Sequence, residues 1–429
     1  MFNSSDLELP PLPTYSVTLR PPLLSPIPDN ATILILPIVA YWTLSMVFHW
    51  IDVNDYFSQY RLHTPAEILK RNRVTRWEVV RDVIIQQVIQ TLFGLVLIIF
   101  DQPEFDGKEG YDVAVWASRV RLAQRAVPRL LALLGIDPVG LAATRLAAYP
   151  LLAAVVSGGH YPFLTQMVSL PSGEMASAPA FAAWELALAH AIYYYIVPLL
   201  QFTYAVTFVD TWQYFLHRAM HMNKWLYTTF RSRHHRLYVP YAFGALYNHP
   251  FEGFLLDTAG TGLAFLTCGM TTRQGMWFFT CSTLKTVDDH CGYAFPWDPL
   301  QHITANNAAY HDIHHQSWGI KTNFSQPFFT FWDALLNTRW QGGDVTKRYE
   351  RSRTAAQKMV DEDTASSSQD TDSQQQQQGA AVVASRDDDD ACTRSLLKRS
   401  VRKTTNSFSP QADSLKGLTH RLSGSIQHK

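Results

Sequence analysis

This sequence has few cysteines and no net charge, and each of these absences argues against a class of protein. Its four cysteines stand singly, without a C-x-x-C pair, so no disulfide framework is indicated and we expect reduced thiols: Cys268, Cys281, Cys291 and Cys392. Lys and Arg total 36, as do Asp and Glu, so no net charge attracts nucleic acid, and no known nucleic-acid motif is present. The sequence also lacks a G-x-G-x-x-G fingerprint and an H-E-x-x-H motif, which argues against a bound dinucleotide and a metalloprotease.

Apolar residues, in contrast, are pooled in long runs. Residues 31–50 carry no charge over about 20 positions, which lets a helix cross a hydrocarbon core of roughly 30 Å. Residues 83–100 and 181–209 are a second and a third candidate span, whereas 254–287 hold two shorter stretches that predict a helical hairpin. We therefore expect an all-α, multi-pass membrane protein. A buried helix of a soluble protein is the alternative for each run.

Basic residues close to the spans predict how the chain crosses the membrane. Six Lys or Arg residues lie between residues 52 and 81, whereas residues 1–30 contain only Arg20. Because basic loops stay on the cytoplasmic side, the N-terminus is expected in the lumen. The second and third crossings then return the chain to the cytosol at residue 210. Several arginines between residues 108 and 145 fall in the lumen in this scheme, which a long loop tolerates.

Composition predicts four segments. They are a lumenal segment (1–30), a membrane-helix region (31–209), a histidine-rich region (210–345) and a disordered low-complexity tail (346–429). After about Arg351 the chain turns to Ser, Gln and Asp, so no core is expected there. The basic end of this tail can contact an anionic membrane surface, although a solvated tail is the simpler interpretation.

The histidines beyond the third apolar run are grouped rather than scattered. Eight of the 16 lie in four short motifs: His217 and His221 in HRAMH, His234 and His235 in RSRHH, His290 in DDHCGY, and His311, His314 and His315 in HDIHH. Helix positions three or four apart share a face, so His217 with His221, and His311 with both His314 and His315, can direct their imidazoles at one point. A lone histidine is ordinarily a core or surface residue, but this grouping predicts a metal site.

The number and type of these side chains favour two redox-active metal ions. Neutral imidazole binds iron, copper, zinc and nickel. Eight nitrogens exceed the four ligands of a structural zinc site, and thiolates are absent from the motifs. A pair of iron ions at a membrane surface suits activation of oxygen and attack on an unactivated C–H bond, whereas zinc would serve only hydrolysis or structure.

The order of the motifs H-x-x-x-H, x-x-x-H-H and H-x-x-H-H between membrane spans resembles the fatty acid hydroxylase and sterol desaturase superfamily of membrane di-iron enzymes. Four longer stretches are similar to its fungal sphinganine C4-hydroxylase branch: DTWQYFLHRAMH (210–221), HHRLYVPYAFGALYNHPFEGFLLDTAGTG (234–262), KTVDDHCGYAFPWDPLQ (285–301) and NNAAYHDIHHQSWGIKTNFSQPFFTFWD (306–333). The resemblance covers about residues 30–345. It leaves residues 101–180, which look like an insert, unexplained.

The resemblance implies hydroxylation of a long-chain sphingoid base or dihydroceramide at C4, in the endoplasmic reticulum membrane. The cofactors would be two iron ions, with O2 as co-substrate and electrons from NAD(P)H through cytochrome b5 and its reductase. The implied metal ligands are the histidines of the motifs, with His290 matching an extra histidine of the branch: His217, His221, His234, His235, His290, His311, His314 and His315. Asp288, Asp289 and Asn307 are candidates to orient ligand imidazoles, with simple helix capping as the alternative.

The second motif departs from the family pattern. The family has H-x-x-H-H, whereas Arg231 holds the first position here. A guanidinium stays protonated and cannot ligate a metal. Three accounts are open: Arg231 turns outward and a water or His249 fills the gap, the protein binds one metal and is inactive, or the residue is a variant. We expect an active or formerly active enzyme.

Two other functions stay open at this point. The first is a different reaction in the same superfamily, such as sterol desaturation or C4-methyl oxidation, because the metal centre is shared and specificity lies in the lipid channel. The second is a catalytically impaired paralogue that binds sphingolipid or pairs with an active enzyme. Arg231 is the residue that favours this second alternative.

Overall fold

The computed structural model describes residues 9–100, 102–169 and 173–377. This part of the chain divides into two compact units. One holds residues 9–26 and 102–203, and the other holds residues 27–100 and 204–377, so the boundary falls inside helix α9 (Val197–Met222). Of the four cysteines, Cys268, Cys281 and Cys291 are free thiols, as predicted, and Cys392 lies outside the described residues.

The first unit is built from short helices and two two-stranded sheets. Its elements are β1 (Thr18–Leu19), β2 (Phe105–Asp106), α4 (Glu109–Gln124), α5 (Val127–Leu133), α6 (Pro138–Thr144), α7 (Pro150–Val156), β3 (Thr165–Ser169), β4 (Met175–Pro179), α8 (Ala183–Ala191) and the π-turn η2 (Ile192–Ile196). Both strand pairs, β1 with β2 and β3 with β4, are antiparallel. Arg121 of α4 and Glu185 of α8 form a buried ion pair that joins these two helices. The predicted insert lies in this unit, and the division into four segments stays a prediction.

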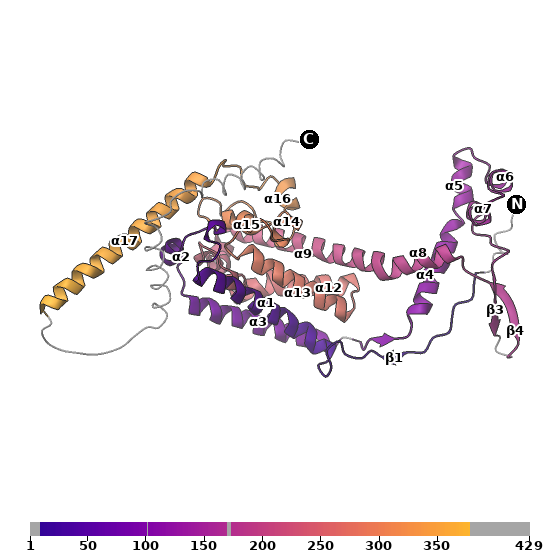
Figure 1. The fold of residues 1–429 in the computed structure, drawn as a ribbon, viewed down its shortest axis with the longest axis horizontal. Coiled ribbons are helices and arrows are strands. Elements are labelled where there is room, and N and C mark those ends of the chain that lie inside the picture. Colours follow the sequence, from indigo (N-terminus) through magenta and orange to yellow (C-terminus); the bar gives the residue numbers. More distant parts are fainter. Residues whose placement is uncertain (1–8, 101, 170–172, 378–429) are drawn as a thin grey trace. The chain divides into compact units, whose positions relative to one another are not determined.

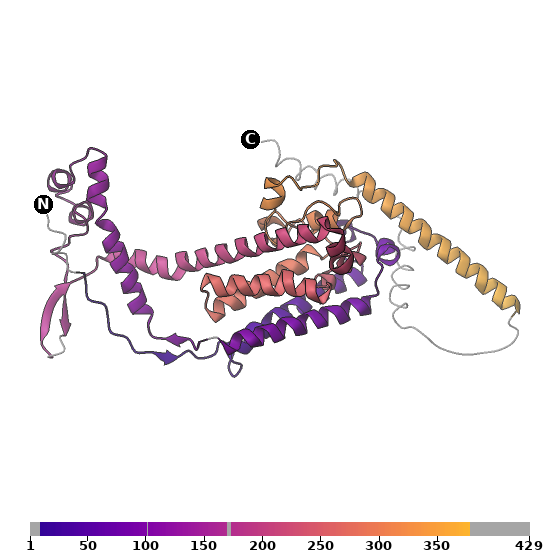
Figure 2. The same ribbon diagram turned by 180° about the vertical axis from the view of Figure 1, so that it is seen from behind.

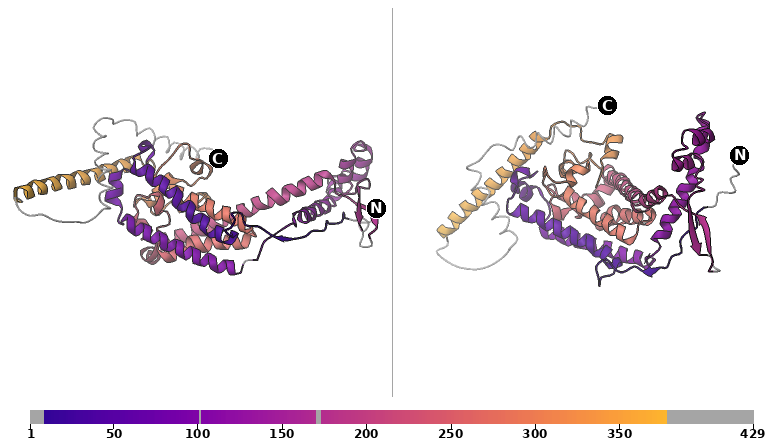
Figure 3. Two further views of the ribbon diagram at one scale, coloured as in Figure 1. Left: turned by 60° about the horizontal axis from the view of Figure 1, so that its bottom comes forward. Right: turned by 45° about the vertical axis from the view of Figure 1, so that its right-hand side comes forward.

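The second unit is a bundle of helices with short helical turns at one end (Figure 1). Its long elements are α1 (Asp29–Val53), α3 (Arg76–Ile99), α9, α12 (Gly260–Cys268), α13 (Thr272–Asp289) and α17 (Thr346–Gln377). The short ones are η1 (Ser58–Tyr60), α2 (Pro65–Arg71), α10 (Lys224–Leu226), η3 (Tyr227–Arg231), η4 (His234–Arg236), η5 (Ala242–Gly244), α11 (Pro250–Gly253), η6 (Phe254–Ala259), α14 (Leu300–Ile303), α15 (Ala308–His315) and α16 (Phe331–Leu335). Helix α1 lies against both α13 and α3, and Figures 2 and 3 show these helices from two further sides.

Local sequence explains where several of these helices begin and end. Thr75 caps α3 and Thr271 caps α13, each in a capping box with the residue three positions later. Helix α12 ends at Gly269, whose φ of 70° is a left-handed conformation that favours glycine. The pair α12 and α13 is the helical hairpin predicted for 254–287. The all-α prediction is confirmed, because the strands are few and short.

Three helices are long and apolar enough to span a membrane: Asp29–Val53, Arg76–Ile99 and Ala183–Met222. A bent pair, Glu109–Leu133 with Pro138–Thr144, passes the same test as a fourth possible span. Only 28%, 22% and 11% of the apolar windows in the three helices are buried inside the protein, so most of their apolar side chains are free to face lipid. Exposed Trp50 and Trp77 stand where α1 ends and α3 begins, the position expected of interfacial tryptophan.

The tail differs from the prediction over its first part. Residues Thr346–Gln377 form helix α17 rather than disordered chain, and residues 378–429, with the basic end, lie outside the described residues. Ala356 and Val360 of α17 pack against Ala66 of α2. Composition alone did not predict this helix, because its contacts are with distant residues: Tyr349 of α17 also packs against Ile313 and donates to Asp312.

Candidate metal centre

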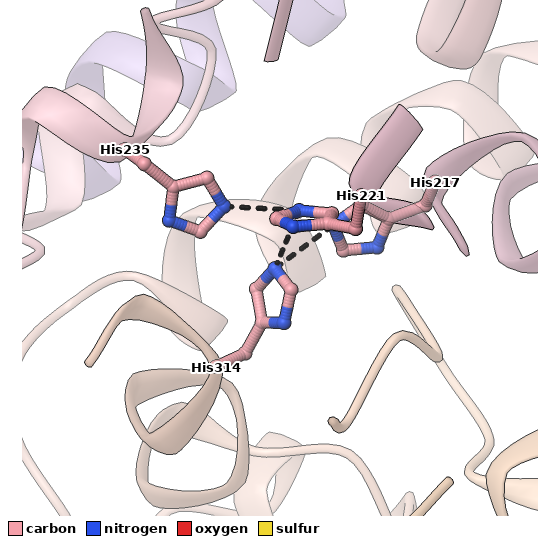
Figure 4. A group of neighbouring side chains, drawn as sticks. All are labelled: His217, His221, His235 and His314. Atoms are coloured by element: carbon pink, nitrogen blue, oxygen red, sulfur yellow. Dashed lines mark hydrogen bonds between the residues drawn. The ribbon is translucent and has the colours of Figure 1, made fainter. Parts of the chain in front are cut away.

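The eight grouped histidines converge at one end of the helix bundle and form two clusters of four. Group A is His217, His221, His235 and His314, and group B is His234, His290, His311 and His315. Within each group the nearest ring nitrogens all lie within 4.8 Å of one another, and all eight side chains are buried. Figure 4 shows the rings of group A turned toward a common point, although they come from α9, η4 and α15.

Chain neighbours are divided between the groups. The adjacent His234 and His235 of η4 point into groups B and A respectively. On α15, His311 and His315 belong to group B, whereas His314 belongs to group A. The expectation that all three histidines of this motif meet at one point is therefore wrong, because four positions and three positions on a helix differ by about 100° in direction.

Five of the rings are oriented by main-chain carbonyls, which accept hydrogen bonds from Nδ1. The acceptors are Phe324 for His217 (2.8 Å), Tyr247 for His234 (2.9 Å), Thr286 for His290 (2.9 Å), Thr322 for His314 (2.7 Å) and Leu237 for His315 (2.8 Å). A carbonyl can only accept, so Nδ1 carries the proton in each case. The Nε2 atom of a neutral ring then presents a lone pair to the centre of its group.

These lone pairs face one another at short range. The Nε2 atoms of His217 and His314 are 2.9 Å apart in group A, and those of His234 and His315 are 3.1 Å apart in group B. All four of these rings already use their Nδ1 proton on a carbonyl, so no ring proton lies between the two nitrogens. Facing lone pairs repel, and a metal ion between the rings converts the same geometry into coordination.

Burial also keeps the imidazoles neutral. Loss of water around the ring lowers the pKa of His290 to about 4 and that of His314 to about 3, with further lowering by the nearby Arg231 cation. Burial lowers the pKa of His235 and His311 well below the ordinary value in the same way. The groups are therefore ready to bind a metal at neutral pH without first releasing protons.

Arg231 enters group A. It ends the π-turn η3, is 1% exposed, and its Nη1 donates to Oε1 of the fully buried Glu252 at 2.7 Å. Its Nη2 lies 2.7 Å from Nε2 of His217, and its Nε donates to Nε2 of His221 at 3.0 Å. The guanidinium thus uses two lone pairs that a metal ion in group A requires.

This geometry overturns the account in which Arg231 turns outward and His249 replaces it. The side chain of Arg231 points inward, and His249 is the N-cap of α11, where its Nδ1 accepts a hydrogen bond from the amide of Phe251. Group B differs, because no Lys or Arg of the described residues donates a hydrogen bond to its ring nitrogens. The donor set of group B therefore fits a metal ion, whereas that of group A fits one only if the guanidinium withdraws.

The three residues expected to orient ligand rings have other partners. Asn307 caps α15 and accepts from the amide of Tyr310, as the capping alternative predicted. Asp289 pairs with Lys285 and accepts from Asn306, and Asp288 accepts from Gln301. None of these contacts involves a histidine of either group, so main-chain carbonyls rather than these three side chains orient the rings.

Acidic residues that the sequence argument missed hold the loop beyond α15 in place. Asp333 accepts from the amides of Phe324 and Ser325, and this fixes the carbonyl of Phe324 that orients His217. Asp210 of α9 accepts from the amides of Phe328 and Phe329 in the same loop. Their signal in the sequence is an isolated carboxylate within an aromatic, apolar run, which needs a partner when it is buried.

A small polar pocket adjoins group B. Three rings of that group line it, His234, His290 and His311, and so do the side chains of Gln213, Asn248, Asp257 and Arg231. Neither Asn248 nor Asp257 was a predicted site residue, although both lie in the stretch 234–262 that carries the resemblance. No histidine of group A lines this pocket, and Arg231 is the residue that contacts both the pocket and group A.

The fold and the site together define a class: a helical membrane protein with two buried histidine clusters that could each hold a metal ion. Residues 202–338 match the family model described as fatty acid hydroxylase. The sphingolipid C4-hydroxylase of Saccharomyces cerevisiae is 42% identical over 341 residues, which cover 79% of this chain and 80% of the relative. The chain belongs to the fatty acid hydroxylase family, and it is an oxidoreductase by that membership.

Two further relatives are also named as a hydroxylase or a monooxygenase. The sphingolipid C4-hydroxylase of Schizosaccharomyces pombe is 42% identical over 330 residues, covering 76% of this chain and 94% of the relative. Methylsterol monooxygenase 1 of Rattus norvegicus is 34% identical over only 143 residues, which are 33% of this chain and 47% of the relative. No solved structure matches the chain.

Proposed function

We propose that this protein hydroxylates C4 of a long-chain sphingoid base or dihydroceramide with O2, at an iron centre held by the grouped histidines. The observation that carries the proposal is the convergence of eight buried imidazoles, from four sequence motifs between residues 217 and 315, into two groups of four. Bound iron would supply the activation of O2 that side chains alone cannot perform. The balanced reaction places one oxygen atom in the C–H bond and reduces the other to water with two electrons and two protons.

The residues proposed to bind the metal are the predicted ones. Group B would hold one ion with four neutral nitrogens. Group A would hold a second ion after the guanidinium of Arg231 leaves His217 and His221. The chain's own contribution is to present Nε2 lone pairs in fixed directions, through the carbonyl bonds to Nδ1, and to exclude water from both groups by burial.

The polar character of the pocket supports a reaction close to a lipid headgroup. A desaturase or hydroxylase that acts in the middle of an acyl chain needs an apolar channel at its metal. Here Gln213, Asn248 and Asp257 line the space beside group B. Carbon C4 of a sphingoid base is bonded to C3, which carries a hydroxyl group, so its oxidation requires polar groups beside the metal.

The proposed reaction also needs a source of electrons and a membrane location. The described chain contains no flavin, heme or nucleotide motif, so electrons would come from NAD(P)H through cytochrome b5 and its reductase. The three apolar helices support a multi-pass membrane protein, with the endoplasmic reticulum as its proposed location. The metal centre would then face the cytosol, where NAD(P)H is available to the proposed reductase.

Expression in cells that lack their own C4-hydroxylase tests the reaction. Mass spectrometry of sphingoid bases is expected to show restored 4-hydroxylated base with the wild-type chain and none with His311→Ala. A sterol substrate would instead leave the bases unchanged and alter methylsterols, which would replace the proposed substrate while keeping the enzyme class.

A catalytically impaired lipid-binding protein is the second candidate, and Arg231 is the observation that favours it. Iron counting separates the two candidates without a substrate. About two ions per purified chain supports a complete di-iron centre, whereas a value near zero supports the non-catalytic protein. A value near one would agree with loading of group B alone.

A further inference from the structure

The pocket beside group B contains a carboxylate that lacks a cationic partner. Asp257 lies in the π-turn η6 and accepts only long hydrogen bonds, from Nε2 of Gln213 at 3.3 Å and from Nδ2 of Asn248 at 3.4 Å. Within the described residues it forms no ion pair. The cations around it are already used, because Arg231 pairs with Glu252 and Lys285 pairs with Asp289. The pocket therefore carries one carboxylate that its own cations do not offset.

A second polar atom in the same pocket is also unused. Asn248 is 6% exposed, and its Oδ1 has no hydrogen-bond partner among the described residues. An unpaired buried acceptor is costly, so its presence beside a carboxylate that has no ion-pair partner among the described residues indicates that a donor from a ligand completes the site. The pocket thus calls for a ligand with a positive charge and with N–H or O–H groups.

The electrostatics of Asp257 agree with such a ligand. Burial raises the pKa of its carboxyl to about 7, and the nearby Glu252 raises it further, against a lowering by Arg231. An isolated carboxylate is therefore poorly stabilised at this position, and an incoming cation stabilises its charged form. The space offers room for roughly one or two groups of the size of a water molecule or an ammonium.

We propose that Asp257, with Asn248 and Gln213, binds the ammonium group and one hydroxyl group of a free long-chain base, and so makes the free base the preferred substrate over its N-acylated form. This inference rests on the proposed function and names the substrate form and the residues that select it. In a sphingoid base the amino group on C2 and the reacting carbon C4 are separated only by C3. A headgroup held at Asp257 therefore places C4 beside the rings of group B that line the same pocket.

The free base and the N-acylated lipid differ in the charge of the nitrogen on C2. A free base carries an ammonium, whereas the N-acylated lipid has a neutral amide at the same position and can offer only one N–H donor. A charge-assisted bond is about twice as strong as a neutral one, so loss of the carboxylate must affect the two lipids differently. Hydroxyl groups are common to both lipids and would bind Asn248 and Gln213 in either case.

Equilibrium binding to the full-length, metal-loaded protein in lipid nanodiscs tests this inference. The probes are radiolabelled sphinganine and a short-chain N-acylsphinganine, without reductant so that no turnover occurs. Asp257→Asn is expected to weaken sphinganine binding about tenfold or more while N-acylsphinganine changes less than about twofold. Asp257→Glu keeps the charge and should keep the preference for sphinganine. Asp361→Asn, on the exposed side of α17, is the control and should change neither.

An equal loss of both lipids, or no loss of sphinganine, would overturn the headgroup site. Metal content and circular dichroism show whether the Asp257→Asn protein is folded. If it is not, Asn248→Ala takes its place, with an expected loss of about threefold or more for both lipids and rejection of the site if neither changes. A wild-type chain that binds sphinganine selectively but forms no 4-hydroxylated base would refute the proposed reaction and leave this site standing. If instead the wild type forms 4-hydroxylated base and Asp257→Asn keeps the same preference for sphinganine, the headgroup site is refuted and the proposed reaction stands.

Discussion

Groups A and B each consist of four buried histidines, yet the two groups differ in one neighbouring residue. Two ring nitrogens of group A receive hydrogen bonds from Arg231, whereas three rings of group B face a polar pocket. Equal ligand counts therefore do not make equal metal sites. What matters is whether each lone pair is still available, and a single guanidinium decides that for group A.

The largest expected effect is on metal binding, and it is measured by replacing one histidine of each group. His311 of group B and His235 of group A both lack an Nδ1 partner among the described residues, so replacing either removes no carbonyl bond. His311→Ala should lower metal affinity and product about a hundredfold or more, because removing a ligand costs at least as much as removing its outer partner. His235→Ala should leave most of the bound metal in place. Metal per chain by mass spectrometry checks both, and equal losses would show that the groups are equivalent.

The next effect concerns the stability of group A. Glu252→Gln leaves the buried Arg231 without its carboxylate, and breaking a buried ion pair in this way costs about 3–5 kcal/mol. The midpoint of chemical denaturation measures this loss. The double variant with Arg231→Gln should recover most of it, because no charge remains buried. The buried Arg121–Glu185 pair of the first unit is the comparison: Glu185→Gln should destabilise the chain without changing its metal content.

Arg231→His tests directly whether the guanidinium limits group A. The change removes the competing donors and restores the imidazole of the family motif, so metal content should rise by about one ion per chain and hydroxylase output should rise with it. Arg233→His is the matched control, because Arg233 pairs with Asp82 and donates to neither group. Equal iron in the wild type and in Arg231→His, with a fully active wild type, would show that position 231 is not a ligand site.

The smallest effect comes from a buried histidine outside both groups. Burial alone would lower the pKa of His63, but Asp312 and Glu67 outweigh it and raise that pKa to about 9. Its charge therefore stabilises the fold fully below the unfolded value of 6.5, and this stabilisation is lost as the pH rises through about 9. His63→Gln should cost about 1–3 kcal/mol at pH 6 and less at pH 9.5. A cost that does not change with pH would mean that His63 is neutral.

Much of the fold could be predicted because it depends on local pattern. The runs 31–50 and 83–100 correspond to Asp29–Val53 and Arg76–Ile99, and the third run became part of Ala183–Met222. The end of that third helix was missed. The prediction stopped at residue 209, where polar residues begin, but the helix continues through both histidines of HRAMH because polar side chains can face the metal centre instead of lipid.

The candidate site could be predicted only in part. The identities of the eight histidines followed from their spacing, and the structure brings all of them together. The orienting partners did not follow, because a main-chain carbonyl leaves no mark in the sequence. Asp257 and Asn248 were missed for a related reason, since each is one polar residue in an apolar stretch until the fold places it beside group B.

The sequence by itself determined the apolar helices, the eight grouped histidines and the positive charge at position 231, where the family motif has histidine. These features depend on residue type and on distances of a few residues along the chain. Only the tertiary structure decided which histidines share a group, that Arg231 points inward, and that an unpaired carboxylate lies beside the metal site. Those features arise where segments separated by tens to hundreds of residues pack together, and the directions of side chains across such contacts are set by the whole bundle rather than by any local pattern.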